Sequence, residues 1–308
     1  MLEILVLADA TDDEDHAVLF PALRERGVSV YRVHPNELTI TIDDSGFTFS
    51  AGGRTLSPSL VLGWVLDDLL IPGMALLDVF ERAGIPVING ALTLFRAQNK
   101  LTDSAQLAAS GVLNYPVTAG TDQRELERWM RQRAVVKPLS GYGGRGLKLI
   151  DAAADLPEGE SFYAVPWIDN PGRDIRVYTV NHHPVFAMYR YAPPGKWITN
   201  VLAGGGIAMC PLTPEVEDLA RRASQAAGTL IGGIDIGENT KTGELVVYET
   251  NSCPSLEPAF MEEVADFLVS AARDLPGTLA TWKPKTVYRE LNDDETLFHE
   301  SKRGKLVR

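Results

Sequence analysis

Three oxygen-bearing side chains late in the chain have the types and spacing of a metal site. Asp235 lies in one apolar run, and Glu249 and Asn251 lie two residues apart in a second run. The polar stretch 238–243 between the runs is typical of a hairpin turn. A closed hairpin places Asp235 opposite Glu249, and two carboxylates with a carboxamide offer the hard oxygen ligands that Mg²⁺ prefers. The alternative is an acidic pair on a solvated strand face.

The alternation of a β-strand predicts which neighbours share the face of this site. Side chains two residues apart along a strand point the same way. We therefore expect Glu249 and Asn251 on the metal-binding face, and Tyr248 and Thr250 on the opposite face. The set contains no His or Cys, which disfavours zinc.

Cations and a glycine-rich loop precede the hairpin. The cations are Lys100, Lys137, Arg176 and Arg190. The loop, GYGGRG at residues 141–146, matches the G-x-G-x-x-G pattern of dinucleotide oxidoreductases, but that pattern requires a following helix, and residues 147–150 have the character of a strand. A glycine loop between two strands can instead cover phosphates with its N–H groups, with an ordinary glycine-rich hairpin as the alternative. Together these features could hold ATP and neutralise a transferring phosphoryl group.

The elements that must position these residues are predicted from the apolar patterning. Residues 2–8 and 28–33 have the character of buried parallel strands around a helix at 13–26, which predicts a small α/β lobe. Its acidic loop 9–15 is expected to be a solvated loop and helix cap, with an acceptor-binding role as the alternative. A hairpin is expected at 40–56.

The second half alternates strands with helices. Helices are expected from about residue 98 to 111, at 124–133, from Thr213-Pro214 onward, and near 261–273. His182 and His183 lie at a turn, where we expect both to be solvated. The basic end of the tail, residues 302–305, is expected to be a mobile terminus rather than a binding patch.

Composition excludes several classes of partner. The 308 residues carry a net charge of −12, which argues against a nucleic-acid-binding surface because phosphate contacts need a clustered basic face. Cys210 and Cys253 cannot build a disulfide framework, which favours a reducing cytoplasm, and Cys253 is expected to pack rather than to act as a nucleophile. No apolar run is long enough to span a bilayer. We expect a cytoplasmic protein of two or three lobes, with a homo-oligomer as one option.

The order of these motifs resembles the ATP-grasp superfamily and, within it, the RimK-like carboxylate–amine ligases. The resemblance runs from about residue 87 to 257. Its motifs are Asn99-Lys100-Leu101, Val136-Lys137 with the glycine loop, Asp174-Ile175-Arg176, Arg190, Asn200, Gly233-Ile234-Asp235 and Glu249-Thr250-Asn251. It implies an α/β fold in which a parallel N-terminal lobe at 1–90 is followed by two α+β lobes, at 91–165 and 166–281, that clasp ATP, and by a tail at 282–308.

The resemblance also implies a role for each site residue. Those that would bind the nucleotide are Lys100, Lys137, Gly141, Gly143, Gly144, Gly146, Val165, Trp167, Ile168 and Asp174. Those that would line the γ-phosphate and acyl-phosphate site are Arg176, Arg190 and Asn200. Those that would bind Mg²⁺, with Mn²⁺ as an alternative, are Asp235, Glu249 and Asn251.

The implied activity is ATP-dependent amide formation between a carboxylate and an amine through an acyl phosphate. The amine would be glutamate or another amino acid, and the acceptor a small molecule or cofactor, a tetrahydromethanopterin-type pterin being one candidate. Neither a nucleic acid nor a membrane is expected as a partner. Asn99 and Ile198 stand where the family more often carries an acid and a base, which keeps a catalytically decayed nucleotide-binding protein as an alternative, beside a phosphotransferase.

Overall fold

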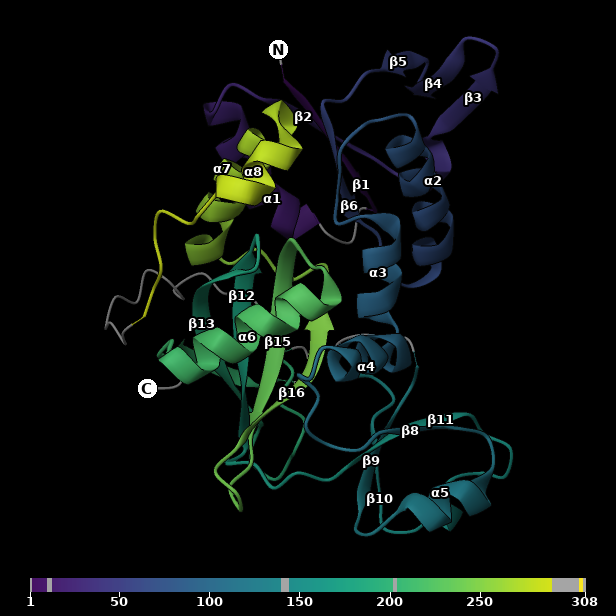
Figure 1. Ribbon diagram of the computed structural model, residues 1–308, viewed down its shortest axis with the longest axis vertical. Helices are drawn as coiled ribbons and strands as arrows, with labels where there is room; N and C mark the ends of the chain where they lie inside the picture. The colour runs from purple at the N-terminus through teal and green to yellow at the C-terminus, as the bar shows by residue number, and fades with distance from the viewer. Residues whose placement is uncertain (1, 10–12, 140–143, 202–203, 290–304, 307–308) are drawn as a thin grey trace.

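The computed structural model describes residues 2–9, 13–139, 144–201, 204–289 and 305–306 of the chain. Their strands form four sheets, of four, three, four and six strands. Figure 1 shows the first two sheets at one end of the molecule and the other two at the opposite end. The predicted fold, a parallel α/β lobe followed by α+β lobes, is confirmed.

The N-terminal lobe is built on a parallel sheet in the order β2-β1-β6-β7. Its elements are β1 (Glu3–Ala8), α1 (Asp13–Glu25), β2 (Ser29–Val33), β6 (Leu60–Trp64), α2 (Leu70–Arg82) and β7 (Val87–Ile88). Alternate residues of β1 enter different cores. Ile4 packs with α1, whereas Leu5 packs with α2, so the continuous apolar run reflects a strand covered on both faces.

The predicted hairpin at 40–56 is a three-stranded antiparallel sheet. Its strands are β3 (Thr39–Asp43), β4 (Gly46–Ala51) and β5 (Arg54–Leu56). The Phe49 ring stacks on Phe80 of α2 with ring centroids 4.2 Å apart, which attaches this sheet to the lobe. Short 3-10 turns lie at Pro35–Glu37, Asp67–Leu69 and Ala153–Asp155.

Two helices lead from the N-terminal lobe into the second half. They are α3 (Ala91–Gln98) and α4 (Lys100–Ala109). Asn99 separates them because its side-chain oxygen accepts from Thr102 N at 3.2 Å and caps the second helix. Lys100 is thus the first residue of α4.

The small sheet of the second half is antiparallel, in the order β10-β9-β11-β8. Its elements are β8 (Thr118–Gly120), α5 (Gln123–Trp129), β9 (Ala134–Lys137), β10 (Lys148–Ile150) and β11 (Phe162–Pro166). The helix predicted at 124–133 ends earlier, because Met130 is already extended.

The large sheet has the order β16-β15-β12-β13-β14-β17. Its strands are β12 (Arg173–Val180), β13 (His183–Tyr191), β14 (Gly206–Cys210), β15 (Ile231–Glu238), β16 (Leu245–Asn251) and β17 (Lys305–Leu306). Helix α6 (Pro214–Ala227) begins at the predicted Thr213 cap and covers one face. Helices α7 (Pro258–Arg273) and α8 (Leu275–Thr281) follow the last long strand.

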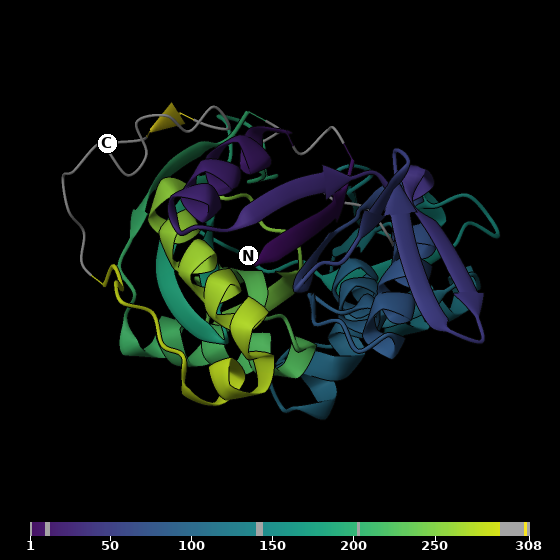
Figure 2. The same ribbon diagram turned by 90° about the horizontal axis from the view of Figure 1, so that it is seen from above.

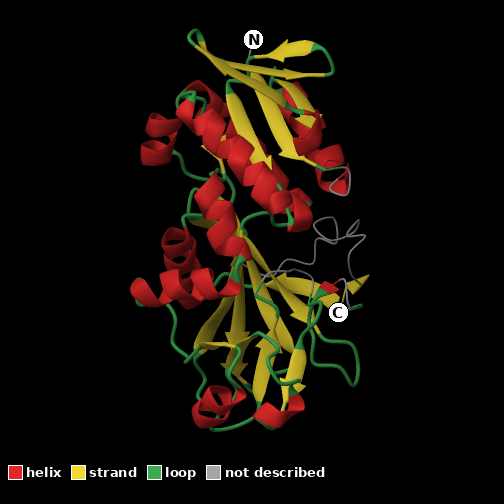
Figure 3. Cartoon of the chain, turned by 90° about the vertical axis from the view of Figure 1, so that its right-hand side faces the viewer, coloured by secondary structure: helices red, strands yellow, loops and turns green. Residues whose placement is uncertain are grey.

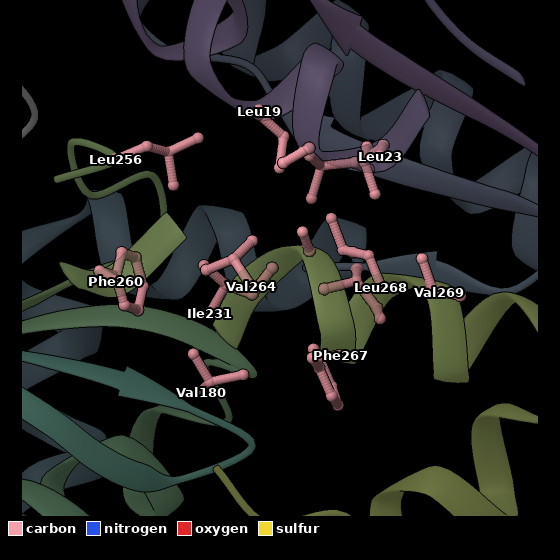
Figure 4. Close-up of a cluster of buried hydrophobic side chains, with 14 of the residues drawn as sticks. Leu19, Leu23, Val180, Ile231, Leu256, Phe260, Val264, Phe267, Leu268 and Val269 are labelled. Atoms are coloured by element: carbon pink, nitrogen blue, oxygen red, sulfur yellow. The ribbon is translucent and has the colours of Figure 1, made fainter. Parts of the chain in front are cut away.

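One hydrophobic core joins the N-terminal lobe to the large sheet. Leu19 and Leu23 of α1 face Val264 and Leu268 of α7, which in turn covers Ile231 (Figure 4). Figure 2 shows α1 and α7 side by side. Each fully buried side chain of this kind contributes about 1.5–3 kcal/mol.

An ion-pair cluster reinforces this junction. Arg26, just beyond α1, lies 2.6 Å from both Glu262 and Asp266 of α7. Figure 3 shows the two lobes stacked along the length of the molecule. The N-terminal lobe is therefore packed onto the large sheet rather than tethered to it.

Two expectations about polar segments are wrong. His182 is not merely solvated, since its Nδ1 lies 2.9 Å from Ser224 Oγ of α6. Lys305 is not part of a mobile end, because it pairs in β17 with Gly206; residues 302–304 lie outside the described residues. The start of the tail is also anchored, with Glu263 accepting from Lys285 N and Thr286 N. Among the described residues, no helix has the length and apolar character needed to cross a membrane.

Candidate active site

A cavity lies between the small sheet and the large sheet. It is lined from the small-sheet side by Lys137 and Val165, and from the large-sheet side by Asp174, Arg190 and Asp235. The predicted site residues that line it are Lys100, Lys137, Gly144, Val165, Trp167, Ile168, Asp174, Arg190, Asn200, Asp235 and Glu249. Arg176, Gly146 and Asn251 are not among the lining residues, and Gly141 and Gly143 lie outside the described residues.

The predicted hairpin is present as β15 and β16. Asp235 pairs directly with Glu249, and Gly233 pairs with Asn251. The Glu249 carboxylate lies 3.0 Å from Lys100 Nζ. Burial opposes its ionisation, but Lys100 and Lys137 more than offset this, and the pKa of Glu249 falls to about 2. Glu249 is therefore an anion throughout the neutral pH range.

A bulge in β16 changes the predicted facing of Tyr248. Asp235 pairs with Glu249, but Ile236 pairs with Val247, so Tyr248 has no partner in β15. A bulge re-aims the side chain of its extra residue. Tyr248 consequently lines the cavity beside Glu249, and the expectation that it points to the opposite face is wrong.

Gly237 makes room for the Tyr248 ring. A Cβ atom at Gly237 would lie 2.1 Å from Tyr248 Cζ and 2.2 Å from its hydroxyl oxygen. Gly237 shares a strand face with Asp235 because the two are two residues apart. The tyrosine ring thus lies on the face of β15 that carries the Asp235 carboxylate.

The two arginines of the site lie in a buried network with two carboxylates. Arg190 Nε and Nη2 each lie 2.7 Å from the Asp174 carboxylate, which also accepts from Thr199 Oγ1 at 2.7 Å. Arg190 Nη2 lies 2.9 Å from Asp235, and Arg176 Nε lies 2.5 Å from the same carboxylate. Burial opposes the charge of Arg190, but Asp174 and Asp235 raise its pKa well above the ordinary value. Breaking one partner of such a network leaves a buried charge unpaired, which costs about 3–5 kcal/mol.

Gly233 allows Arg176 to lie against β15. A Cβ atom at Gly233 would lie 2.6 Å from Arg176 Nη1 and 3.2 Å from Pro254 Cβ. The glycine therefore sets the path of the arginine toward Asp235. The close approach of Arg176 therefore accounts for a glycine two residues before Asp235.

Lys137 brings a poorly compensated positive charge into the cavity. Burial lowers the pKa of its ammonium group, Glu249 opposes this effect, and neighbouring Lys100 adds to it. Its Nζ lies 5.9 Å from the centre of the Tyr248 ring. A buried cation of this kind is stabilised by a bound anion, so this part of the cavity suits phosphate groups.

Gly144 and the segment after β13 meet at the rim of the cavity. Gly144 has a φ of +74°, and a Cβ atom there would lie 2.6 Å from Asn200 Oδ1 and 2.9 Å from Ile198 Cγ2. Only glycine combines that backbone conformation with that close approach. Gly144 therefore lies against Asn200 at the rim of the cavity.

The other end of the cavity is apolar and aromatic. Val135 and Val165 contribute aliphatic surface, and Trp167 and Trp197 meet edge to face with ring centroids 5.7 Å apart. Trp167 is fixed by its Nε1, which donates to Asp169 at 2.7 Å. Flat aromatic and aliphatic walls next to a cationic pocket match a nucleobase joined to phosphates.

The donor set of the hairpin fits a hard divalent cation. Asp235 and Glu249 supply two carboxylates, and Asn251 Nδ2 donates to Gly233 O at 3.3 Å, which leaves its amide oxygen as an acceptor. In the described part of the chain no three His, Cys, Asp or Glu side chains gather as a metal cluster. Two carboxylates with additional ligands from phosphate and water are the usual surroundings of Mg²⁺.

Several residues at this site were not anticipated from the sequence. Thr199 fixes Asp174, Trp197 covers the aromatic end, and Tyr248 enters through the bulge. The neighbouring Gly237 is the one sequence signal for the last of these, since glycine in a strand interior often marks a bulge or a close approach. Thr199 and Trp197 lie in a loop, where no periodicity reports direction.

Comparison with solved structures identifies the class of protein. The ATP-grasp ligase PsnB complexed with its minimal precursor superposes with a TM-score of 0.70 at 19% identity, covering 87% of this chain and 99% of that chain. The D-alanyl-alanine synthetase A of Vibrio cholerae superposes with a TM-score of 0.66 at 16% identity, covering 91% and 99%. The fold is that of the ATP-grasp ligases.

Sequence relatives define the family. The RimK-like ATP-grasp domain model matches residues 163–269. The tetrahydromethanopterin:alpha-L-glutamate ligase of Methanosarcina acetivorans is 31% identical over 273 residues, which cover 75% of this chain and 81% of that protein. A probable alpha-L-glutamate ligase of Shewanella frigidimarina is 27% identical, with 82% and 89% covered. The chain belongs to the RimK-like ATP-grasp family and is an ATP-dependent carboxylate–amine ligase. Ligases of this class use ATP and Mg²⁺.

Proposed function

We propose that this ligase joins L-glutamate to the carboxylate of a small-molecule acceptor. The observation that carries the proposal is the meeting of Lys100, Lys137 and Arg190 with the Asp235–Glu249 pair in one cavity. Cations and a divalent-metal site held together in this way suit phosphoryl transfer from ATP to a carboxylate. The choice of glutamate and of a tetrahydromethanopterin-type pterin as acceptor is supported by what the relatives are named for.

Each group of residues has a separate role in this proposal. Lys100 and Lys137 bind the phosphates of ATP, and the base lies at the aromatic end beside Val165, Trp167 and Trp197. Asp235, Glu249 and Asn251 hold Mg²⁺, which neutralises the phosphate oxygens when bound. Mn²⁺ is a substitute, since it takes the same oxygen ligands.

The arginines act on the transferring group. Arg190 and Arg176 lie at Asp235, where they can stabilise the negative charge that develops on the phosphoryl and acyl-phosphate oxygens. Asp174 keeps Arg190 in place through two hydrogen bonds. Asn200, which lies against Gly144, donates its amide hydrogens to the same oxygens. Donors fixed in advance in this way stabilise the transition state without reorganising.

The chemistry occurs in two displacements. An oxygen of the acceptor carboxylate attacks the γ-phosphorus, and the bond from phosphorus to the bridging oxygen breaks. ADP departs, and the acceptor is now an acyl phosphate. The neutral amine of glutamate then attacks the acyl carbon, the carbon–oxygen bond to phosphate breaks, and the amine proton leaves with the phosphate. One ATP is consumed for each amide formed.

A substrate panel tests this proposal. The protein is incubated with Mg·ATP, L-glutamate and a set of pterin and other small carboxylates, and ADP release is measured beside mass spectrometry of the products. We expect ADP only when amine and acceptor are both present, together with a glutamyl adduct. With ¹⁸O in the acceptor carboxylate, one label should appear in the released phosphate.

Other products would contradict the proposal. A stable phosphorylated acceptor without an amide would indicate a phosphotransferase. Nucleotide binding without turnover across the whole panel would indicate a binding protein whose catalysis has decayed. Turnover with an amine other than glutamate would support the ligase activity but contradict the choice of glutamate as the amine substrate.

A further inference from the structure

The outer edge of β16 is held by side chains rather than by another strand. Among the described residues, β16 is the end strand of the large sheet, so its outward-facing N–H and C=O groups have no partner strand there. Asn114 Nδ2 donates to Leu245 O at 2.9 Å near the start of this edge. Asp103 accepts from Thr250 N at 2.9 Å and from Thr250 Oγ1 at 2.6 Å near its end.

Tyr115 fastens the middle of the same edge, at the bulge. Its hydroxyl donates to Val247 O at 2.9 Å and lies 3.3 Å from Tyr248 O. These two carbonyls lie on either side of the bulge residue. A donor shared between them fixes the peptide orientation there, and with it the direction of the Tyr248 side chain and the start of Glu249.

Tyr115 and Asp103, the two residues that hold this edge next to the site, lie outside the cavity. Tyr115 and Asp103 are not among the residues that line the cavity, whereas Tyr248 and Glu249 are. Asp103 also lies on α4, whose first residue, Lys100, pairs with Glu249 from the cavity side. The ligand-bearing strand is thus held from both sides.

We propose that Tyr115 and Asp103 are positioning residues that hold the bulged edge of β16 so that Tyr248 and Glu249 enter the nucleotide site in register. The proposal rests on the proposed function, because it takes the cavity to be the Mg·ATP site. It predicts that removing either fastening weakens nucleotide binding without removing any group that touches the nucleotide. Asn114 offers a matched control, because its hydrogen bond to Leu245 O lies on the same edge, three residues before Tyr248.

The first test compares Tyr115→Phe with Asn114→Ala. Affinity for Mg²⁺ with the non-hydrolysable analogue AMPPNP is measured by calorimetry, and thermal unfolding is measured in parallel. Loss of one buried hydrogen bond at the bulge should weaken binding about tenfold, which corresponds to about 1.4 kcal/mol. Asn114→Ala should change the affinity less than about twofold, within the scatter expected of an exposed site. Wild-type affinity in Tyr115→Phe with a lowered unfolding temperature would overturn the proposal.

A double-mutant cycle tests whether Tyr115 acts through Tyr248. In the Tyr248→Ala background, Tyr115→Phe should lower AMPPNP affinity less than it does in the wild type, because only its effect through Glu249 remains. Full additivity of the two changes would overturn this route. A wild-type protein that does not bind AMPPNP with Mg²⁺ would instead overturn the proposed function, and the positioning role with it.

Substitution of Asp103 supplies an independent readout. In Asp103→Asn, Oδ1 can accept from Thr250 N and Nδ2 can donate to Thr250 Oγ1, so both bonds are retained. In Asp103→Ala, both are lost. AMPPNP affinity should fall in the alanine variant and recover in the asparagine variant. Equal loss in both would contradict positioning by hydrogen bonds.

Discussion

At the scale of single residues, the site is a set of buried charges held near their partners. Asp174 and Asp235 compensate Arg190, and Lys100 compensates Glu249. Asp103 differs from these carboxylates because burial raises its pKa to about 7, against which the Thr250 hydrogen bonds act. Ionisation of Asp103 is therefore costly in the folded protein.

Asp103 should give the protein a pH-dependent stability that Asp103→Asn lacks. Its carboxyl group has a pKa of about 7 when folded and 3.8 when unfolded, so between these values the folded state retains a proton that the unfolded state has released. Stability from this group is therefore full below pH 4 and is lost as the pH rises to about 7. In urea unfolding, the free energy of unfolding of Asp103→Asn relative to that of the wild type should rise by on the order of a few kcal/mol between pH 4 and pH 8. Parallel stability curves would contradict the raised pKa.

At the scale of elements, the hairpin of β15 and β16 is more than two alternating strands. The bulge at Tyr248 and the missing Cβ of Gly237 together place an aromatic ring beside Glu249. The pairing of Asp235 with Glu249 could be predicted from residue spacing and turn chemistry alone. The bulge could not, because one unpaired residue leaves the apolar pattern of a short strand almost unchanged.

Gly237→Ala should displace the Tyr248 ring from the cavity. The new methyl group would lie 2.1 Å from Tyr248 Cζ, so the ring has to move, at a cost in stability of about 1–3 kcal/mol. AMPPNP affinity should fall with it. Gly120→Ala in β8 is the control, since its Cβ would meet Phe162 at an ordinary 3.6 Å. Equal nucleotide affinity in both variants would show that the ring makes no contribution to the site.

At the scale of the whole molecule, a buried asparagine ties the N-terminal lobe to the hairpin of β15 and β16. Asn89 Nδ2 donates to Ile231 O and Ser252 O at 2.8 Å each, and Asn89 Oδ1 accepts from Leu230 N at 2.8 Å. With the shared core of α1 and α7, these bonds fix the root of the hairpin to the lobe that precedes it. The parallel lobe, the order of the motifs and the ligase family could all be predicted from the sequence. The junction could not, because its contacts join residues more than 140 positions apart.

The central claim is that the cavity binds Mg·ATP through the carboxylates of the hairpin. The most direct measurement is calorimetric titration of AMPPNP into the wild type and Glu249→Gln, each with and without Mg²⁺. Loss of a charged ligand should cost at least about 1.4 kcal/mol, so we predict Mg²⁺-dependent binding in the wild type that weakens tenfold or more in Glu249→Gln. Equal affinity in the two proteins, or wild-type binding that is indifferent to Mg²⁺, would contradict it.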